Sequence, residues 1–393
     1  MQLAERMRRL GTETAFEVLA QAKHLEAQGH DIVHLEIGEP DFDTPGFIIE
    51  AAYAALKEGY THYGPAAGLP ELRATIAEHV RATRKVDVTP EQVVVTPGGK
   101  PIIFYSILAL IEPGDEVIIP DPGFPIYESV VRFVGGIAKM VPLREELGFR
   151  WDLDELRAAI TPRTRMIIIN SPHNPTGAVL TESDLHEIAN LALKHDLIVL
   201  ADEIYSEIIY DGVHRSILSI PGMAERTILL DGFSKTFAMT GWRLGYGVMP
   251  VELAPHITRL IINSVSCTAT FVQRAGLHAL RGPRDEVQQM VAAFRQRRDF
   301  IVDGLNAIDG IRCHKPAGAF YVFPNVQGLG MRSSLLAAKL LQEYDVAVLS
   351  GTAFGEAGEG YLRISYATSL ENLQKGLERI RRAVADLKES DAK

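Results

Sequence analysis

Two charged side chains, Lys235 and Asp202, follow apolar segments at positions where they could do chemistry. Lys235 comes shortly after the segment 227–230, and Asp202 comes shortly after the segment 198–200. A lysine in a partly desolvated site has a lowered pKa and can act as a Schiff-base nucleophile. A buried carboxylate beside a cationic heterocycle stays ionised and keeps the ring nitrogen protonated. The two residues could therefore bind and activate a heterocyclic cofactor.

A second pattern is typical of a phosphate site. Gly98 and Gly99 precede Lys100 at a predicted strand-to-helix turn. Two glycines allow a close approach of the backbone, and the N-terminus of a helix offers free N–H groups. Arg243, which follows Lys235 in the next segment, could form a bidentate pair with the same phosphate.

Short apolar segments predict the strands that would position these residues. They are residues 92–95, 116–119, 166–169, 198–200, 227–230 and 244–248. Helices are predicted at residues 102–111, 152–160 and 182–195. Strands that alternate with helices predict an α/β fold with a mostly parallel sheet covered on both faces. Ligands of such sheets bind at the carboxyl ends of the strands, so Asp202, Tyr205 and Lys235 should converge there.

The pattern changes at about residue 285, where long helical segments surround short strands. The predicted helices are 284–308, 333–344 and 370–387, and the predicted strands are 319–323 and 361–365. We expect a large domain at residues 46–284 and a smaller α+β domain at residues 285–393. The N-terminal segment 1–45, with a helix at 14–28 and a strand at 32–35, should join the small domain.

The composition argues against several classes of protein. A formal net charge of −10 disfavours binding to nucleic acid and to anionic membranes. No apolar run is long enough to span a bilayer, and the N-terminus lacks the apolar core of a signal peptide. The two cysteines, Cys267 and Cys313, form neither a disulfide framework nor a zinc motif, which favours a reducing, cytoplasmic location.

Two further signals are weaker. His30 and His34 have a spacing that suits a metal site on a helix, but they fall in a predicted strand, so we expect no metal. Arg274 could contact an acidic substrate, although a place on a helix that faces solvent or the small domain is the more ordinary interpretation.

Each pattern alone has an ordinary structural explanation, such as a turn or a helix cap, but their order is informative. Residues 232–245, Gly-Phe-Ser-Lys-Thr-Phe-Ala-Met-Thr-Gly-Trp-Arg-Leu-Gly, resemble the pyridoxal phosphate attachment signature of class I/II aminotransferases. Further motifs occur in the order of that family at residues 37–42, 63–68, 98–100, 170–177, 202–205 and 363–365. The resemblance covers nearly the whole chain.

This resemblance implies a fold type I, aspartate-aminotransferase-like enzyme that binds pyridoxal 5'-phosphate. The implied activity is ping-pong transfer of an amino group between an L-amino acid and a 2-oxo acid through a Schiff base on Lys235. Such enzymes are usually homodimers with shared active sites. A C–S β-lyase or a related lyase would use the same residues and stays an alternative. A pyridoxal-phosphate-binding regulator is disfavoured, because the sequence leaves no room for its N-terminal DNA-binding extension.

The resemblance also implies a role for each residue of the cofactor site. Catalysis is assigned to Lys235, which carries the cofactor and moves the proton, and to Asp202 and Tyr205. Asp202 would pair with the pyridine nitrogen, while Tyr205 and Asn174 would hydrogen-bond the ring oxygen O3′. The residues expected to bind the cofactor are Gly98, Gly99, Lys100, Phe124, Asn174, Asp202, Tyr205, Ser234, Lys235, Arg243 and Tyr63. Tyr63 would arrive from the neighbouring subunit.

For the substrate, the resemblance implies that Arg363 clamps the α-carboxylate, with Gly38 and Asn174 nearby. The chain departs from many relatives at Phe124, where tyrosine or tryptophan often stacks on the ring. It departs from some at Gly232, where a hydroxyl residue binds the phosphate, so Ser234 or a water molecule could supply that hydrogen bond. The second, acid-binding arginine of the family is not identifiable, and aspartate-like, aromatic and small aliphatic donors all stay open.

Overall fold

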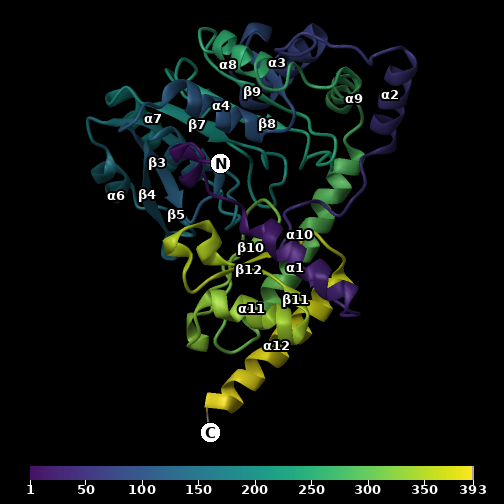
Figure 1. Ribbon diagram of the computed structural model, residues 1–393, viewed down its shortest axis with the longest axis vertical. Helices are drawn as coiled ribbons and strands as arrows, with labels where there is room; N and C mark the ends of the chain where they lie inside the picture. Colours follow the sequence, from purple (N-terminus) through teal and green to yellow (C-terminus); the bar gives the residue numbers. More distant parts are fainter. Residues whose placement is uncertain (392–393) are drawn as a thin grey trace.

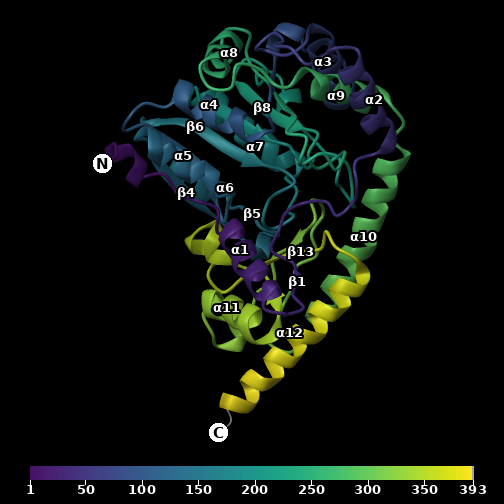
Figure 2. The ribbon, with the colours of Figure 1, turned by 45° about the vertical axis from the view of Figure 1, so that its right-hand side comes forward.

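The computed structural model describes residues 1–391, which form an upper and a lower part as drawn in Figure 1. The upper part, residues 46–281, contains a large sheet and the helices around it. The lower part, residues 14–34 and 307–391, contains small sheets and their helices. The long helix α10 (Asp285–Asn306) runs from one part to the other along the edge of the molecule (Figure 2).

One eight-stranded sheet forms the centre of the upper part. In spatial order its strands are β2 (Val93–Thr96), β9 (Gly245–Val248), β8 (Thr227–Gly232), β7 (Ile198–Asp202), β6 (Thr164–Asn170), β3 (Glu116–Asp121), β4 (Ile137–Arg144) and β5 (Arg150–Trp151). Neighbours from β8 to β4 are parallel, whereas β9 is antiparallel to both of its neighbours. Because β9 reverses direction once on each side, β2 points the same way as β8. The carboxyl ends of β2, β8, β7 and β6 therefore meet at one rim of the sheet.

Helices cover both faces of this sheet. They are α2 (Gly46–Lys57), α3 (Pro70–Arg84), α4 (Lys100–Leu110), α5 (Ile126–Val134), α6 (Leu153–Ala159), α7 (Glu182–Lys194), α8 (Ala254–Ile262) and α9 (Thr270–Arg281). Met166 and Ile168 of β6 pack with α4, α5 and α8, whereas Ile167 and Ile169 pack with α6 and α7. Successive residues of a strand point to opposite faces, which explains why the central strands are apolar throughout.

The lower part joins both ends of the chain. Its elements are α1 (Thr14–Ala27), β1 (Val33–His34), β10 (Tyr321–Val322), α11 (Ser333–Tyr344), β11 (Val346–Ala347), β12 (Leu349–Ser350), β13 (Leu362–Ser365) and α12 (Leu370–Asp391). Strand β1 pairs in parallel with β11, and β13 lies antiparallel between β10 and β12. Phe294, Phe320 and Tyr366 fill the core between these strands and α10.

The segment before α1 contacts the upper part instead. The backbone N–H of Gly11 donates to Ser129 Oγ at 2.9 Å, and Arg9 donates to the carbonyl of Phe133 at 3.3 Å. Ser129 and Phe133 belong to α5. The N-terminal residues therefore cross from one part of the molecule to the other.

The observed architecture confirms the predicted α/β class with a mostly parallel sheet. Each predicted strand of the upper part is present, with its ends shifted by a few residues. Thr181 caps α7 and accepts a hydrogen bond from the N–H of Asp184. The prediction omitted β4, because Lys139 and Pro142 interrupt its apolar pattern and most of its side chains are only half-buried. In the described part of the chain, no helix combines the length and apolar character needed to cross a bilayer.

Candidate active site

A cavity of about 520 Å³ lies at the rim where the strand ends meet. Asp202 ends β7, Asn170 ends β6, and Lys235 follows β8, so parallel strands bring these three side chains together. The lower part closes the other side of the cavity with Tyr321 and Arg363. The sequence-predicted residues that line it are Gly38, Gly99, Lys100, Phe124, Asn174, Asp202, Tyr205, Ser234, Lys235, Arg243 and Arg363. A cavity of this size is typical of small-molecule sites.

Asp202 is a buried carboxylate, with 4% of its surface exposed. Tyr127 Oη donates to its Oδ2 at 2.7 Å, and the N–H of Ile204 donates to its Oδ1 at 3.2 Å. Burial raises the pKa of Asp202 to about 6, because desolvation disfavours the charged form. A cationic partner in the cavity would favour the ionised form.

Lys235 projects its amine into the same cavity. Its Nζ donates to the carbonyl of Gly38 at 2.6 Å. Burial lowers the pKa of Lys235 to about 8, against an opposing effect of the Glu39 carboxylate. Gly38 has to be glycine, because a Cβ there would collide with the phenol of Tyr321. At neutral pH, a larger fraction of this amine is neutral and nucleophilic than of an ordinary lysine.

Arg363 is a buried guanidinium with unused hydrogen-bonding capacity. Only 4% of its surface is exposed, and its Nε has no hydrogen-bond partner among the described residues. Its Nη1 lies 3.4 Å from Oδ1 of Asn174, and its Nη2 donates to the carbonyl of Glu36. The rings of Tyr321 and Phe354 flank it, with centroids 4.7 and 5.0 Å from Cζ. A buried charge without a carboxylate partner is costly, so this site is suited to an anionic ligand.

The N-terminus of α4 offers groups that could bind a second anion. Gly99 and Lys100 line the cavity there, and no side chain caps this helix. Gly98 adopts a φ of +87°, and a Cβ at this position would collide with the guanidinium of Arg243. Ser234 and Arg243 line the same cavity. Backbone donors, a hydroxyl and an arginine are the groups that bind a phosphate.

Two tyrosines link the walls of the cavity. Tyr205 Oη and Tyr321 Oη are 2.8 Å apart. Asn174 is held in place because its N–H donates to Oδ1 of Asn170 at 2.8 Å. Tyr63 lies elsewhere: it is not part of the cavity and 88% of its surface is exposed.

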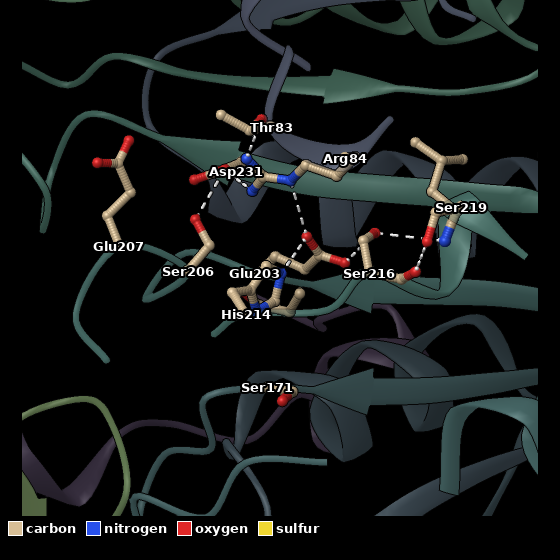
Figure 3. Close-up of polar contacts among 12 residues, drawn as sticks. Thr83, Arg84, Ser171, Glu203, Ser206, Glu207, His214, Ser216, Ser219 and Asp231 are labelled. Atoms are coloured by element: carbon tan, nitrogen blue, oxygen red, sulfur yellow. Dashed lines mark hydrogen bonds and ion pairs between the residues drawn. The ribbon is translucent and has the colours of Figure 1, made fainter. Parts of the chain in front are cut away.

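A buried polar cluster lies next to the carboxyl ends of β7 and β8 (Figure 3). Arg84, at the end of α3, donates to Glu203 at 3.2 Å and to Asp231 at 2.5 Å. Glu203 also accepts from Ser216 and contacts His214 Nε2 at 2.7 Å. Glu203 is the residue after Asp202, and Asp231 is four residues before Lys235. The cluster therefore fixes the two strand ends that carry the site.

The other predicted signals lie outside the cavity. His30 contacts Asp345 at 2.7 Å, and His34 contacts Glu36 and Glu26. Arg274 pairs with Glu71 at 2.6 Å. Among the described residues, no group of histidine, cysteine or acidic side chains could hold a metal ion.

Sequence reasoning missed several residues that line or support the cavity. They are Glu13, Phe16, Glu39, Tyr127 and Tyr321. Tyr321 falls in the predicted strand 319–323, so its place could have been suspected from alternation along that strand. No local signal marks Tyr127, because its contact with Asp202 depends on how α5 packs on the sheet.

Comparison with known proteins identifies the family. Residues 30–380 match the family described as Aminotransferase class I and II. The chain is 44% identical to the aspartate aminotransferase of Pyrococcus abyssi, over 91% of this chain and 93% of that protein. It is also 44% identical to the aromatic-amino-acid aminotransferase 2 of Thermococcus litoralis, over 92% and 94% respectively. The chain belongs to the class I and II aminotransferase family.

The fold agrees with this family along the whole chain. The aspartate aminotransferase of Thermus thermophilus with maleate superposes with a TM-score of 0.94, at 42% identity over 97% of this chain and 99% of that chain. The protein is a pyridoxal-phosphate-dependent aminotransferase, and its substrates are amino acids and 2-oxo acids. The resemblance and the cofactor predicted from the sequence are thereby confirmed.

The residues of the cavity fit this cofactor. A pyridine nitrogen requires an acid, and Asp202 is buried there. A phosphate requires donors, and the uncapped end of α4 with Ser234 and Arg243 offers them. A carbonyl requires an amine, and burial lowers the pKa of Lys235 to about 8.

Proposed function

We propose that this aminotransferase attaches its cofactor to Lys235 and binds the substrate α-carboxylate with Arg363. The single observation that carries the proposal is the location of Lys235 and the buried Arg363 in one cavity. Arginine matches a carboxylate with two charge-assisted hydrogen bonds, and the free Nε of Arg363 supplies one of the donors.

The cofactor would be held by several groups at once. Asp202 would bind the pyridine nitrogen, and Tyr205 with Asn174 would bind the ring oxygen O3′. Phe124 would stack on the ring. Gly98, Gly99 and the backbone of Lys100 would bind the phosphate together with Ser234 and Arg243. These assignments are supported by the shared cavity, which all of these residues except Gly98 line, and by the match of the family model across all of them.

When bound, pyridoxal phosphate supplies a protonated ring that accepts the electron pair left by cleavage of the substrate Cα–H bond. Lys235 Nζ would take the proton from Cα and return it. Arg363 and the backbone of Gly38 would orient the Cα–H bond toward Lys235, with Asn174 beside them. Tyr127 would keep Asp202 ionised by donating to Oδ2.

Borohydride reduction tests the attachment site. Reduction of the yellow protein should fix the cofactor to one lysine, and peptide mapping should find it at Lys235. A label on another lysine would contradict the assignment. Reaction products separate amino transfer from β-elimination: a 2-oxo acid that keeps the side chain indicates the former, whereas a lyase releases the side-chain thiol.

We also propose that the enzyme is a homodimer in which Tyr63 reaches the phosphate of the neighbouring subunit. Exposed apolar residues on α2 support this, because Ile49, Tyr53 and Leu56 are each more than 40% exposed. Tyr63 follows α2 in sequence and is itself 88% exposed. Sedimentation at assay concentrations should give a dimer, and an active monomer would rule out the shared site.

Two further expectations belong to this proposal. The division into an N-terminal segment 1–45, a large domain 46–284 and a small domain 285–393 is supported by the start of α2 at Gly46 and of α10 at Asp285. A reducing, cytoplasmic location is supported by the two unpaired thiols of Cys267 and Cys313. Limited proteolysis and cell fractionation test them.

A further inference from the structure

One end of the cavity carries a lysine whose charge is already paired. The ammonium group of Lys100, at the start of α4, contacts the carboxylate of Glu13. The rings of Phe16 and Phe124 flank the same ammonium, with centroid distances of 5.8 and 5.3 Å. All four residues line the cavity. Lys100 is therefore surrounded by two aromatic rings and a carboxylate of its own chain.

The charges that line this cavity do not favour a second carboxylate on the substrate. Under the proposed function, on which this inference rests, the other three cations bind the phosphate, the α-carboxylate and the cofactor carbonyl. Asp202 is assigned to the pyridine nitrogen. Of the charged residues that line the cavity in the described part of the chain, Lys100 then remains with Glu13 and Glu39. These three carry a net negative charge.

A substrate carboxylate would have to displace Glu13 from Lys100. The side chain of Lys100 is 40% exposed, so solvent screens this ion pair and its interaction energy is small. Glu13 is nevertheless tethered to the same chain and competes at a high effective concentration. Glu39, which accepts a hydrogen bond from Thr240, would repel an incoming carboxylate.

Several of the remaining lining residues are apolar. Ile37 and Ile103 contribute to the cavity, and Phe16 presents a ring that is 61% exposed. An exposed ring at the wall of a cavity favours an apolar group that covers it. An aromatic or branched aliphatic side chain could contact Phe16 and Phe124 and leave the pair of Glu13 and Lys100 intact.

We propose that this aminotransferase acts on amino acids with uncharged apolar side chains, aromatic or branched aliphatic, in preference to dicarboxylic amino acids. The carboxylate of Glu13 occupies the cation that a second substrate carboxylate would need. Glu13 is therefore a specificity-determining residue, and its removal frees Lys100 to bind acidic substrates.

Equilibrium binding of two unreactive acids tests this without turnover. 3-Phenylpropionate presents one carboxylate and a ring, whereas succinate presents two carboxylates. Calorimetry on the holoenzyme should give a Kd for 3-phenylpropionate that is lower than that for succinate by about tenfold or more. Glu13→Gln should tighten succinate by about tenfold and leave 3-phenylpropionate nearly unchanged. Glu17→Gln, on an exposed position of α1, is the matched control and should change neither.

Single-turnover conversion of the bound cofactor to its amine form distinguishes the substrate class from the proposed function. Phenylalanine or leucine should react faster than aspartate, and Glu13→Gln should raise the rate with aspartate. If aspartate or lysine is the fastest donor, or if Glu13→Gln leaves succinate binding unchanged, the substrate class is overturned while amino transfer stands. If no donor converts the cofactor, the proposed function itself fails.

Discussion

The phenol of Tyr127 donates a 2.7 Å hydrogen bond to Oδ2 of Asp202, from a helix to the end of a central strand. Both side chains are buried. Burial raises the pKa of Asp202 to about 6, and the Tyr127 donor limits this rise because it bonds the ionised form. Tyr127 thus positions and tunes the acid that would hold the cofactor ring.

Tyr127→Phe should therefore make Asp202 harder to ionise. A hydrogen bond to a charged group contributes about 1.5–3 kcal/mol, so kcat/KM should fall by about tenfold or more. The acidic limb of its pH profile should move to higher pH, because the pKa of Asp202 rises when the donor is lost. Tyr344→Phe removes a comparable bond to Asp386 in the lower part and should leave the limb in place. An acidic limb at the wild-type position in Tyr127→Phe would contradict this role.

Replacement of Arg363 should affect every amino acid substrate equally. Arg363→Lys keeps the positive charge but loses the planar guanidinium that can donate two hydrogen bonds to one carboxylate. The value of kcat/KM should therefore fall by about one to two orders of magnitude, and further in Arg363→Ala. Cofactor affinity should be nearly unchanged. An amine substrate without a carboxylate serves as the control and should be almost insensitive. Intact amino acid turnover in Arg363→Ala, or loss of cofactor instead, would exclude the carboxylate clamp.

Removal of Arg84 should destabilise the fold. Arg84→Met leaves Glu203 and Asp231 buried without this cation, which should cost about 3–5 kcal/mol of unfolding free energy. Urea unfolding followed by circular dichroism measures the shift of the midpoint. Arg312→Met removes an ion pair with Glu145 at an exposed arginine and should have a far smaller effect. Equal shifts in the two variants would show that the cluster contributes no more than a surface pair.

His34 should make the stability depend on pH above neutrality. The hydrogen bond to Glu36 raises the pKa of His34 to about 9, against an opposing effect of burial. Because the folded pKa exceeds the unfolded value near 6.5, the stabilisation is complete below pH 6.5 and is lost as the pH rises through 9. The Tm difference between wild type and His34→Gln should be larger at pH 6 than at pH 10. In a Glu36→Gln background, this dependence on pH should become weaker, because only Glu26 then remains to raise the pKa of His34.

The residues at the strand ends were predictable because the local sequence determines them. Lys235, Asp202 and the Gly98–Gly99 turn each follow an apolar run, and parallel strands must bring such positions to one rim. Arg363 came from the family motif alone. Its place in the cavity depends on the contact of β13 with the residues after β1, where the N–H of Ser365 donates to the carbonyl of Leu35 and Arg363 donates to that of Glu36. No periodicity encodes that contact.

The contacts of Glu13 and Tyr127 were not predictable for a related reason. Glu13 reaches Lys100 only because the segment before α1 crosses from the lower to the upper part. Tyr127 reaches Asp202 only because α5 packs on one face of the sheet. Both are contacts between side chains far apart in sequence, and a single sequence carries no record of them.

The pairing of β1 with β11 affects the order in which the enzyme can take shape during synthesis. Strand β1 leaves the ribosome early, whereas Val346 and Ala347 are made near the end, and every strand of the large sheet lies between them. The large sheet, with Asp202 and Lys235 at its rim, can therefore form before β1 pairs with β11. A nascent chain that stops before β11 would contain the groups that we propose bind the cofactor but would lack Arg363. Under this proposal, the ability to recognise an amino acid is acquired last.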